Sequence, residues 1–339
     1  MNFKRFISVL LAFIMLFAFC ACQEADNDES NSSKTESQAS SAQSQAEYSL
    51  EVEIDNDDRE CSVTPAFWKA TDKDGDVIWL FGSIHVGKEE FYPLPEAVTD
   101  AFKQSEAIAV EFDMIAFEND MSAAVEALKI MVYSDGSKIS DHIPKELYDD
   151  AVKLLSDAGV YNALYDYYQP SLWMSLISNL SLDKIGLDAK YGIDNCLLLT
   201  AKSENKEILE IESADEQYKM LASFSEELQI ALLEDAVELE KSGESANETI
   251  ELAKAWEKGN IEELTEMLSV PDDIELTDIE SEYWDAMMTK RNNKMTDFCV
   301  KSLKEGKEVF VVVGLAHFLG EDGIVNQLVE LGYTVEEID

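Results

Sequence analysis

The chain has 339 residues, of which 46% are hydrophobic, and this is enough apolar material for a large core. Asp and Glu number 70 against 26 Lys and Arg, so the formal net charge is −44 at pH 7. Such a charge repels polyanions before contact, which excludes nucleic acid as a partner. We interpret the acidity as favouring solubility outside the cytoplasm.

The N-terminus has the pattern of an export signal over residues 1–21. The basic start MNFKR precedes FISVLLAFIMLFAF, an apolar run that is too short to span a membrane comfortably. The run ends in FAFCAC, which resembles a bacterial lipobox with Cys22 as the acylated first residue of the mature protein. We therefore expect an exported protein that is lipid-anchored to the cell membrane on its extracytoplasmic face, with a plain secreted protein as the alternative.

Residues 22–60 are expected to form a disordered tether after the lipidated cysteine, because this stretch is rich in Ser, Gln and acidic residues and has little to bury. The folded domain is then expected over 61–339. It contains Cys61, Cys196 and Cys299, which lie far apart and form no CxxC pattern. One disulfide among them is possible, but the spacing indicates neither a zinc knuckle nor a disulfide framework.

The first part of the domain has a β-α-β order. Two β-rich runs between residues 61 and 81 flank the turn signal DKDG, which predicts a hairpin. LPEAVTDAFKQS then predicts a helix, and AIAVEFD at 107–113 predicts a buried strand that ends in acids. A strand, a helix and a strand in this order favour parallel pairing.

The middle of the chain, about 120–305, is largely helical by its apolar spacing and is interrupted by the strand EILEIE at 207–212. The last strands are EVFVVVG at 308–314 and YTVEEI at 333–338, with a helix between them. We therefore predict an α/β fold with a mixed, mainly parallel sheet built from N- and C-terminal strands. The helical middle is predicted to be a large insertion or cap.

Two strand ends share one pattern, in which a glycine is followed three residues later by a histidine: Gly82 with His85, and Gly314 with His317. The chain has only three histidines. Ligand sites in open α/β sheets form at the carboxyl ends of the strands, where Glu111 should also lie. Two imidazoles and a carboxylate match a catalytic divalent-metal site with an open position for water. The alternative is that each histidine only closes a strand end by hydrogen bonding.

These segments resemble the TraB/GumN family, which includes the TIKI-type membrane metalloproteases and is similar in layout to the ChaN and erythromycin-esterase group. The matching segments occur in the family's order and cover the chain from about residue 65 to its end. They are FGSIHVG at 81–87, VEFD at 110–113, YGIDNCLLLTAKSENKEILEIESADEQ at 191–217, KRNNKM at 290–295 and VVVGLAHFLGEDGIVNQLVELGYTVEEI at 311–338. The resemblance implies that His85, Glu111 and His317 are core site residues, that Arg291 and Asn292 lie nearby, and that Asp194 and Glu212 are family positions.

Physical roles can be assigned to several of these residues. Arg291 could hold a substrate carboxylate or stabilise an oxyanion, Asn292 could orient a water or a carbonyl, and an exposed helical face is the alternative for both. Glu111 could be a metal ligand or the general base. Glu212, at a strand end, could complete the acidic set. Asp194 is expected to be the N-cap of the helix that follows it.

We hypothesise a surface-anchored, metal-dependent hydrolase of the peptidase class, in which the ion held by the two histidines and Glu111 activates water. Residue types alone do not rank Mn²⁺, Co²⁺ and Zn²⁺ as its cofactor. The expected partners are a peptide or small-molecule substrate and the membrane, through the N-terminal lipid. The alternative is a non-catalytic lipoprotein that binds a metal, haem or a small ligand at the same sheet edge. GxSxG, HExxH, P-loop and GxGxxG motifs are absent from the sequence.

Overall fold

The computed structural model describes residues 53–55, 59–271 and 274–338, so the predicted export signal, Cys22 and most of the predicted tether lie outside the described residues. At the end of the tether range, Ile54 is buried and its carbonyl oxygen accepts a hydrogen bond from the Leu94 backbone N–H at 2.9 Å. In the described part of the chain, no helix is long and apolar enough to cross a membrane.

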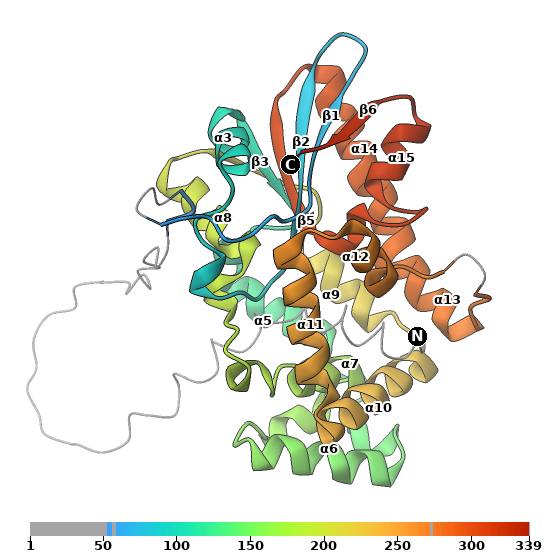
Figure 1. The fold of residues 1–339 in the computed structure, drawn as a ribbon. Coiled ribbons are helices and arrows are strands. Elements are labelled where there is room, and N and C mark those ends of the chain that lie inside the picture. Colours follow the sequence, from blue (N-terminus) through green and yellow to red (C-terminus); the bar gives the residue numbers. More distant parts are fainter. Residues whose placement is uncertain (1–52, 56–58, 272–273, 339) are drawn as a thin grey trace, which may run out of the picture.

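A six-stranded sheet forms the centre of the domain, in the order β4-β3-β5-β2-β1-β6 (Figure 1). The strands are Phe67–Thr71 (β1), Val77–Ser83 (β2), Ala107–Val110 (β3), Glu207–Glu210 (β4), Val309–Gly314 (β5) and Thr334–Glu337 (β6). β2, β5, β3 and β4 pair in parallel, and β1 pairs antiparallel with both β2 and β6. The predicted mixed, mainly parallel sheet and the β1–β2 hairpin are therefore confirmed. β3 ends at Val110, three residues earlier than predicted.

Helices make up most of the rest of the domain. The α-helices are Glu96–Gln104 (α3), Met114–Asn119 (α4), Met121–Ile130 (α5), Lys145–Asp157 (α6), Pro170–Ser178 (α7), Ile193–Ser203 (α8), Ala214–Ala222 (α9), Glu226–Ser242 (α10), Glu244–Lys258 (α11), Ile261–Leu268 (α12), Asp278–Trp284 (α13), Lys290–Glu305 (α14) and Ile324–Glu330 (α15). The short helices are Glu89–Phe91 (η2), Ile139–Asp141 (η3), Ala163–Tyr167 (η4), Leu182–Lys184 (η5), Ala189–Tyr191 (η6), the π-helical turn Asp285–Thr289 (η7) and Leu315–Phe318 (η8).

The helices are divided between the sheet and a separate group below it. α3 and α8 lie on one side of the sheet, and α14 and α15 pack together on the other (Figure 1). α6, α7 and α10 pack against one another away from the sheet, and α11 and α12 rise from this group to the ends of the central strands. The predicted helical middle is confirmed, with β4 as its one contribution to the sheet.

The parallel register brings the two glycine-histidine frames to nearly the same level. Ser83 of β2 pairs with Gly314 of β5, so the frames are offset by a single residue. Gly82 lies within β2, where it leaves space for Leu315: a Cβ at residue 82 would lie 2.3 Å from Leu315 Cδ1 and 3.2 Å from Leu315 Cα. The chain after β5 can therefore fold down onto the end of β2 only because residue 82 has no side chain.

This close approach predicts a difference between the two glycines. Gly82→Ala forces Leu315 and its backbone to move and should lower the free energy of unfolding by about 1–3 kcal/mol. A Cβ at Gly314 would have Glu111 Oε1 as its nearest neighbour at 3.4 Å, which is an ordinary contact, so Gly314→Ala should cost much less. Urea unfolding midpoints at an unchanged m-value would measure both costs. Equal losses in the two variants would contradict the steric role of Gly82.

Candidate functional site

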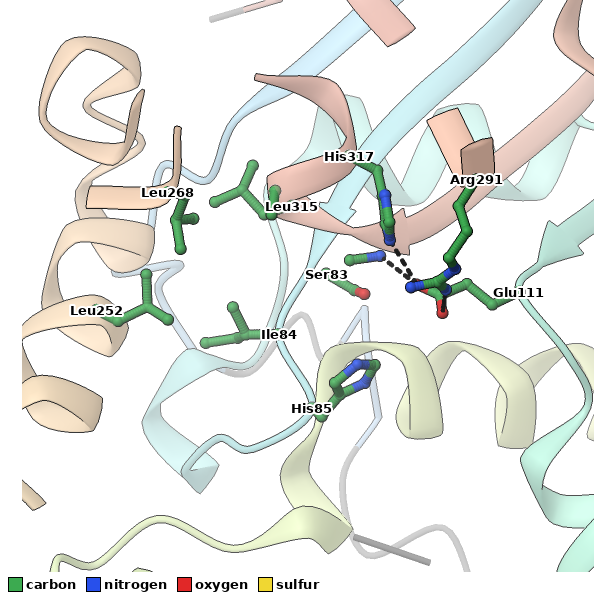
Figure 2. A pocket seen from close by; sticks show the side chains of 11 residues that line it. Ser83, Ile84, His85, Glu111, Leu252, Leu268, Arg291, Leu315 and His317 are labelled. Atoms are coloured by element: carbon green, nitrogen blue, oxygen red, sulfur yellow. Dashed lines mark hydrogen bonds and ion pairs between the residues drawn. The ribbon is translucent and has the colours of Figure 1, made fainter. Parts of the chain in front are cut away.

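One pocket contains the side chains of His85, Glu111, Arg291 and His317, which come from the ends of β2, β3 and β5 and the first turn of α14 (Figure 2). The pocket has room for a few water-sized molecules, whose centres can occupy about 40 Å³, and it opens to solvent on one side. Its complete lining is Ser83, Ile84, His85, Glu111, Leu252, Leu268, Arg291, Gly314, Leu315, Ala316 and His317. Because the parallel strands end at the same edge of the sheet, residues that are up to 232 positions apart in the sequence meet in this pocket.

His85 is oriented by Asp194. The first turn of α8 docks on the loop after β2, where the Ile193 N–H donates to the Ile84 carbonyl oxygen at 2.9 Å. A Cβ on Gly192 would lie 2.4 Å from the His85 carbonyl oxygen, so this approach requires glycine. Asp194 Oδ2 then hydrogen-bonds His85 Nδ1. Because a carboxylate only accepts, Nδ1 carries the proton and Nε2 is the ring nitrogen with a lone pair.

The prediction that Asp194 caps α8 is wrong. The N-cap position is Gly192, which offers no side-chain hydrogen bond, and Asp194 is a buried residue in the first helical turn. Its Oδ1 accepts from the Asn195 backbone N–H at 3.0 Å, while Oδ2 is used by His85. Asp194 is therefore a positioning residue for a site histidine.

His317, in η8, is oriented by Asn292. The Asn292 side-chain amide donates to the Asp322 carbonyl oxygen at 2.8 Å, so its Oδ1 is the atom that faces His317 Nδ1, at 2.6 Å. Nδ1 must therefore donate, which again leaves the lone pair on Nε2. His317 Nε2 lies 3.8 Å from Glu111 Oε1, too far for a hydrogen bond. Arg291 and Asn292 are both buried, so the alternative of an exposed helical face is wrong for these two residues of RNNK at 291–294.

A buried ionic network holds Glu111. The Arg291 Nη2 donates to Glu111 Oε2 at 2.6 Å and to Glu212 Oε2 at 2.9 Å, and Nε donates to Glu212 Oε1 at 3.0 Å. Gln217 donates to Oε2 of the same two carboxylates, at 3.0 and 2.9 Å. Glu111 Oε1 accepts from the Gly314 backbone N–H at 2.9 Å. Arg291 is thus neutralised by two protein carboxylates, Glu111 and Glu212.

These contacts shift the pKa values of Glu111, His317 and His85 in different ways. Burial disfavours a charged Glu111, but Arg291 and the two histidines outweigh it and hold the pKa of this carboxyl well below its usual range. Burial, together with the Arg291 charge, lowers the pKa of His317 to about 3. Burial also disfavours protonation of His85, but the charge and hydrogen bond of Asp194 outweigh it and raise the pKa of His85 above 6.5. At neutral pH, Glu111 is therefore ionised, His317 is neutral, and His85 is the most basic of the three.

Ser83 is a pocket residue that the sequence does not single out. It is 2% exposed, it lines the pocket, and its Oγ has no hydrogen-bond partner among the described residues. An unpaired buried hydroxyl is costly, so such a group in a pocket indicates a partner supplied by a ligand. The one feature of the sequence that could have indicated Ser83 is its position directly after Gly82, at the end of the strand. Gln217, which joins two carboxylates, has no comparable signal.

The donor set fits a divalent metal in chemistry. Both histidines have Nδ1 bound to an oriented acceptor, which is the arrangement that commonly supports metal-binding imidazoles, and His317 is neutral as a ligand must be. The spacing is wider than in a formed site. Across residues 53–55, 59–271 and 274–338, no three His, Cys, Asp or Glu side chains are grouped so that they could hold a metal ion.

The remaining predicted positions lie outside the pocket. Cys61 is exposed, Cys196 and Cys299 are buried, and the three form no disulfide among the described residues. His142 lies in the turn between η3 and α6, as expected, where its ring stacks on Tyr133 with a centroid distance of 4.0 Å. Neither group takes part in the site.

Comparison with known proteins assigns the chain to a family. The model of the TraB/PrgY/gumN family matches residues 66–337. The chain belongs to this family. It is also 28% identical over 257 residues to the uncharacterized protein YbaP of Escherichia coli K12, which covers 74% of this chain and 86% of the relative, and it matches YbaP of Shigella flexneri to the same extent. No solved structure matches the chain significantly. The matched range contains every residue of the pocket.

The lowered pKa of His317 predicts a specific acid sensitivity. In the unfolded chain this ring binds a proton near pH 6.5, whereas in the fold it does so only near pH 3, so the stability it contributes is present above pH 6.5 and is lost as the pH falls. The raised pKa of His85 makes a contribution that is constant below pH 6.5. Between pH 6.5 and 5, the free energy of unfolding should therefore fall with a slope approaching about 1.4 kcal/mol per pH unit from this group.

Urea unfolding at several pH values in this range would measure the slope for the parent, His317→Gln and, as a control, His142→Gln. We expect the slope to be reduced in His317→Gln alone. A slope that is the same in the parent and in His317→Gln would contradict a neutral, buried His317. Following the three imidazole signals by NMR over the same range gives an independent reading, in which one ring stays neutral down to pH 5.

Proposed function

We propose that this protein is a surface-anchored, metal-dependent hydrolase of the peptidase class. The observation that carries the proposal is the orientation of the two histidines: each is hydrogen-bonded through Nδ1, by Asp194 or by Asn292, in one pocket with an ionised Glu111. Fixed imidazoles and a carboxylate at the ends of neighbouring parallel strands are the parts from which hydrolytic metal sites are made.

His85, His317 and Glu111 would hold the ion, with Mn²⁺, Co²⁺ and Zn²⁺ as the candidates. When bound, such an ion polarises a substrate carbonyl and lowers the pKa of water. The low pKa of Glu111 makes it a poor general base, which favours the role of ligand over the role of proton acceptor. His85, backed by Asp194 at Nδ1, would bind the ion through the lone pair on Nε2 and is then not available as a proton acceptor.

Arg291 and Ser83 have different roles in this proposal. Arg291 keeps Glu111 ionised and in place, and its own charge is balanced by Glu111 and Glu212. The Ser83 hydroxyl has no partner among the residues that the structure describes, so it is available to donate to the substrate carbonyl oxygen. Glu212, Gln217 and Asn292 act through other side chains and are positioning residues.

Metal analysis together with a hydrolysis screen tests this proposal. After loading with Mn²⁺, Co²⁺ or Zn²⁺, we expect close to one ion per chain in the parent, and loss of the ion in His85→Ala and His317→Ala. The loaded parent should cleave members of a mixed peptide library. Ser83→Ala should keep the ion but lower turnover about 100-fold, because it removes one donor to the developing charge.

Two results would count against the proposal in different ways. A fully loaded protein that cleaves nothing supports the alternative of a non-catalytic lipoprotein that binds a metal, haem or a small ligand. Cleavage that is undiminished after chelation would remove the metal from the mechanism and leave water activation to His85 and Asp194. The variant Thr296→Ala is a suitable control, because it also removes a buried hydroxyl that lacks a partner among the described residues, but not one that lines the pocket.

The anchoring part of the proposal rests on the sequence of residues 1–22 and has its own test. Acylation of Cys22 predicts that the parent fractionates with membranes and incorporates labelled palmitate, whereas Cys22→Ser is released in soluble form. Cys61→Ser is the control, since Cys61 is an exposed thiol in the folded domain. Membrane association that persists in Cys22→Ser would contradict a lipid anchor at this position.

A further inference from the structure

The pocket has two halves of different chemistry. His85, Glu111, Arg291 and His317 form the ionisable half described above, and Ser83 lies between this half and the rest (Figure 2). The other half is lined only by apolar side chains, those of Ile84, Leu252, Leu268, Leu315 and Ala316. Leu252 and Leu268 come from α11 and α12, so these two helices close one side of a pocket that is otherwise built by the strand ends, η8 and the start of α14.

α11 is fixed in place by Trp256. Its indole N–H donates to the carbonyl oxygen of Gly82 at 2.8 Å, which ties the helix to the end of β2. The ring also packs against Phe91, with a centroid distance of 5.1 Å, and against Phe81 at 6.4 Å. Leu252 lies one helical turn before Trp256 and is presented to the pocket by this anchored helix.

α12 is fixed at its end by contact with the loop after η8. Gly320 has a positive φ of 78°, and a Cβ there would lie only 2.8 Å from Ser269 Oγ. The residue directly after α12 therefore packs against backbone that only glycine can supply. Leu268, the last residue of α12, is held at the pocket by this contact. Both walls are thus attached to the end of the sheet by specific contacts.

Within the described ranges, two kinds of contact are missing in this pocket: packing contacts for its apolar side chains and a hydrogen bond for Ser83. Apolar side chains that border empty space lack the packing contacts that a filled core provides. At the boundary, the buried hydroxyl of Ser83 lacks a hydrogen-bond partner among the described residues. A molecule with an apolar side chain next to a carbonyl group would satisfy both requirements at once. A charged side chain would not, because no ionisable group lines this half and burial of an unpaired charge is costly.

We propose that Ile84, Leu252, Leu268 and Leu315 form a specificity subsite for an apolar side chain adjacent to the substrate carbonyl on which the site acts. The assignment rests on the proposed hydrolase function for the meaning of that carbonyl. It adds the substrate class: peptides or amides with a leucine-like or aromatic side chain at this position, in preference to glycine or charged residues.

The test measures binding rather than turnover, so it is independent of catalysis. The probes are the N-acetyl amides of leucine, phenylalanine, glycine, aspartate and lysine, which differ only in the side chain. Ligand-observed NMR with the exported chain carrying Cys22→Ser, in the absence of detergent, gives their affinities. We expect the leucine amide to bind about 10- to 100-fold more tightly than the glycine amide, and the aspartate and lysine amides to bind no better than glycine.

Two variants of Leu268 assign the preference to the subsite. Leu268→Phe fills the apolar half and should abolish the preference for leucine over glycine while leaving the glycine amide bound. Leu268→Ala widens the same space and should shift the preference toward phenylalanine. Leu264→Ala is the matched control, since Leu264 is an equally buried leucine of α12 that does not line the pocket. Leu264→Ala should prefer the leucine amide over the glycine amide to the same extent as the parent, even if it is less stable.

The outcomes separate this inference from the proposed hydrolase. A leucine preference that Leu268→Phe abolishes and Leu264→Ala preserves supports the subsite, even if no peptide is cleaved. Equal affinity for all five amides, or a preference that survives in Leu268→Phe, overturns it, even if the metal-loaded protein is an active hydrolase. If Leu268→Ala does not fold, Leu268→Phe and the parent decide the question.

Discussion

The buried guanidinium of Arg291 is the centre on which the polar half of the pocket depends. It binds Glu111 after β3 and Glu212 after β4, so it joins α14 to the ends of two parallel strands. An unpaired charge at this depth would be strongly destabilising, so each member of the group requires the others. The same positive charge is one cause of the low pKa of His317 and of the ionised state of Glu111. Packing and chemistry are therefore set by one interaction.

Much of this arrangement follows from local sequence patterns. The apolar runs at the strands, the DKDG turn and the two glycine-histidine frames indicate a parallel sheet with its polar residues at one edge, and the structure has this form. The convergence of His85, Glu111 and His317 follows from a general property of such sheets. The position of Arg291 and Asn292 next to them was implied by the family motif.

The contacts between distant segments were beyond the reach of the sequence. Asp194, near the start of a helix, has the appearance of a cap, and only the docking of α8 on the loop after β2 reveals that it binds His85. Ser83 is an ordinary strand residue until its hydroxyl is found buried beside ionisable groups. The role of Gly82 is also visible only in the structure, because the atoms that exclude a side chain belong to Leu315, which is more than two hundred residues away in the chain.

The two halves of the pocket differ in how well they tolerate amino-acid substitutions. In the ionic half, a single substitution leaves a buried charge or hydrogen-bonding group without its partner. Each such substitution therefore lowers the stability of the fold. In the apolar half, Leu252 and Leu268 are constrained only by shape, and they sit on two helices that contribute nothing to the sheet. Under the proposed function, Leu252 and Leu268 can therefore be replaced without disturbing the ionic half, while Trp256 continues to hold α11 in place. The proposed chemistry and the proposed choice of substrate would then be inherited through different parts of the chain.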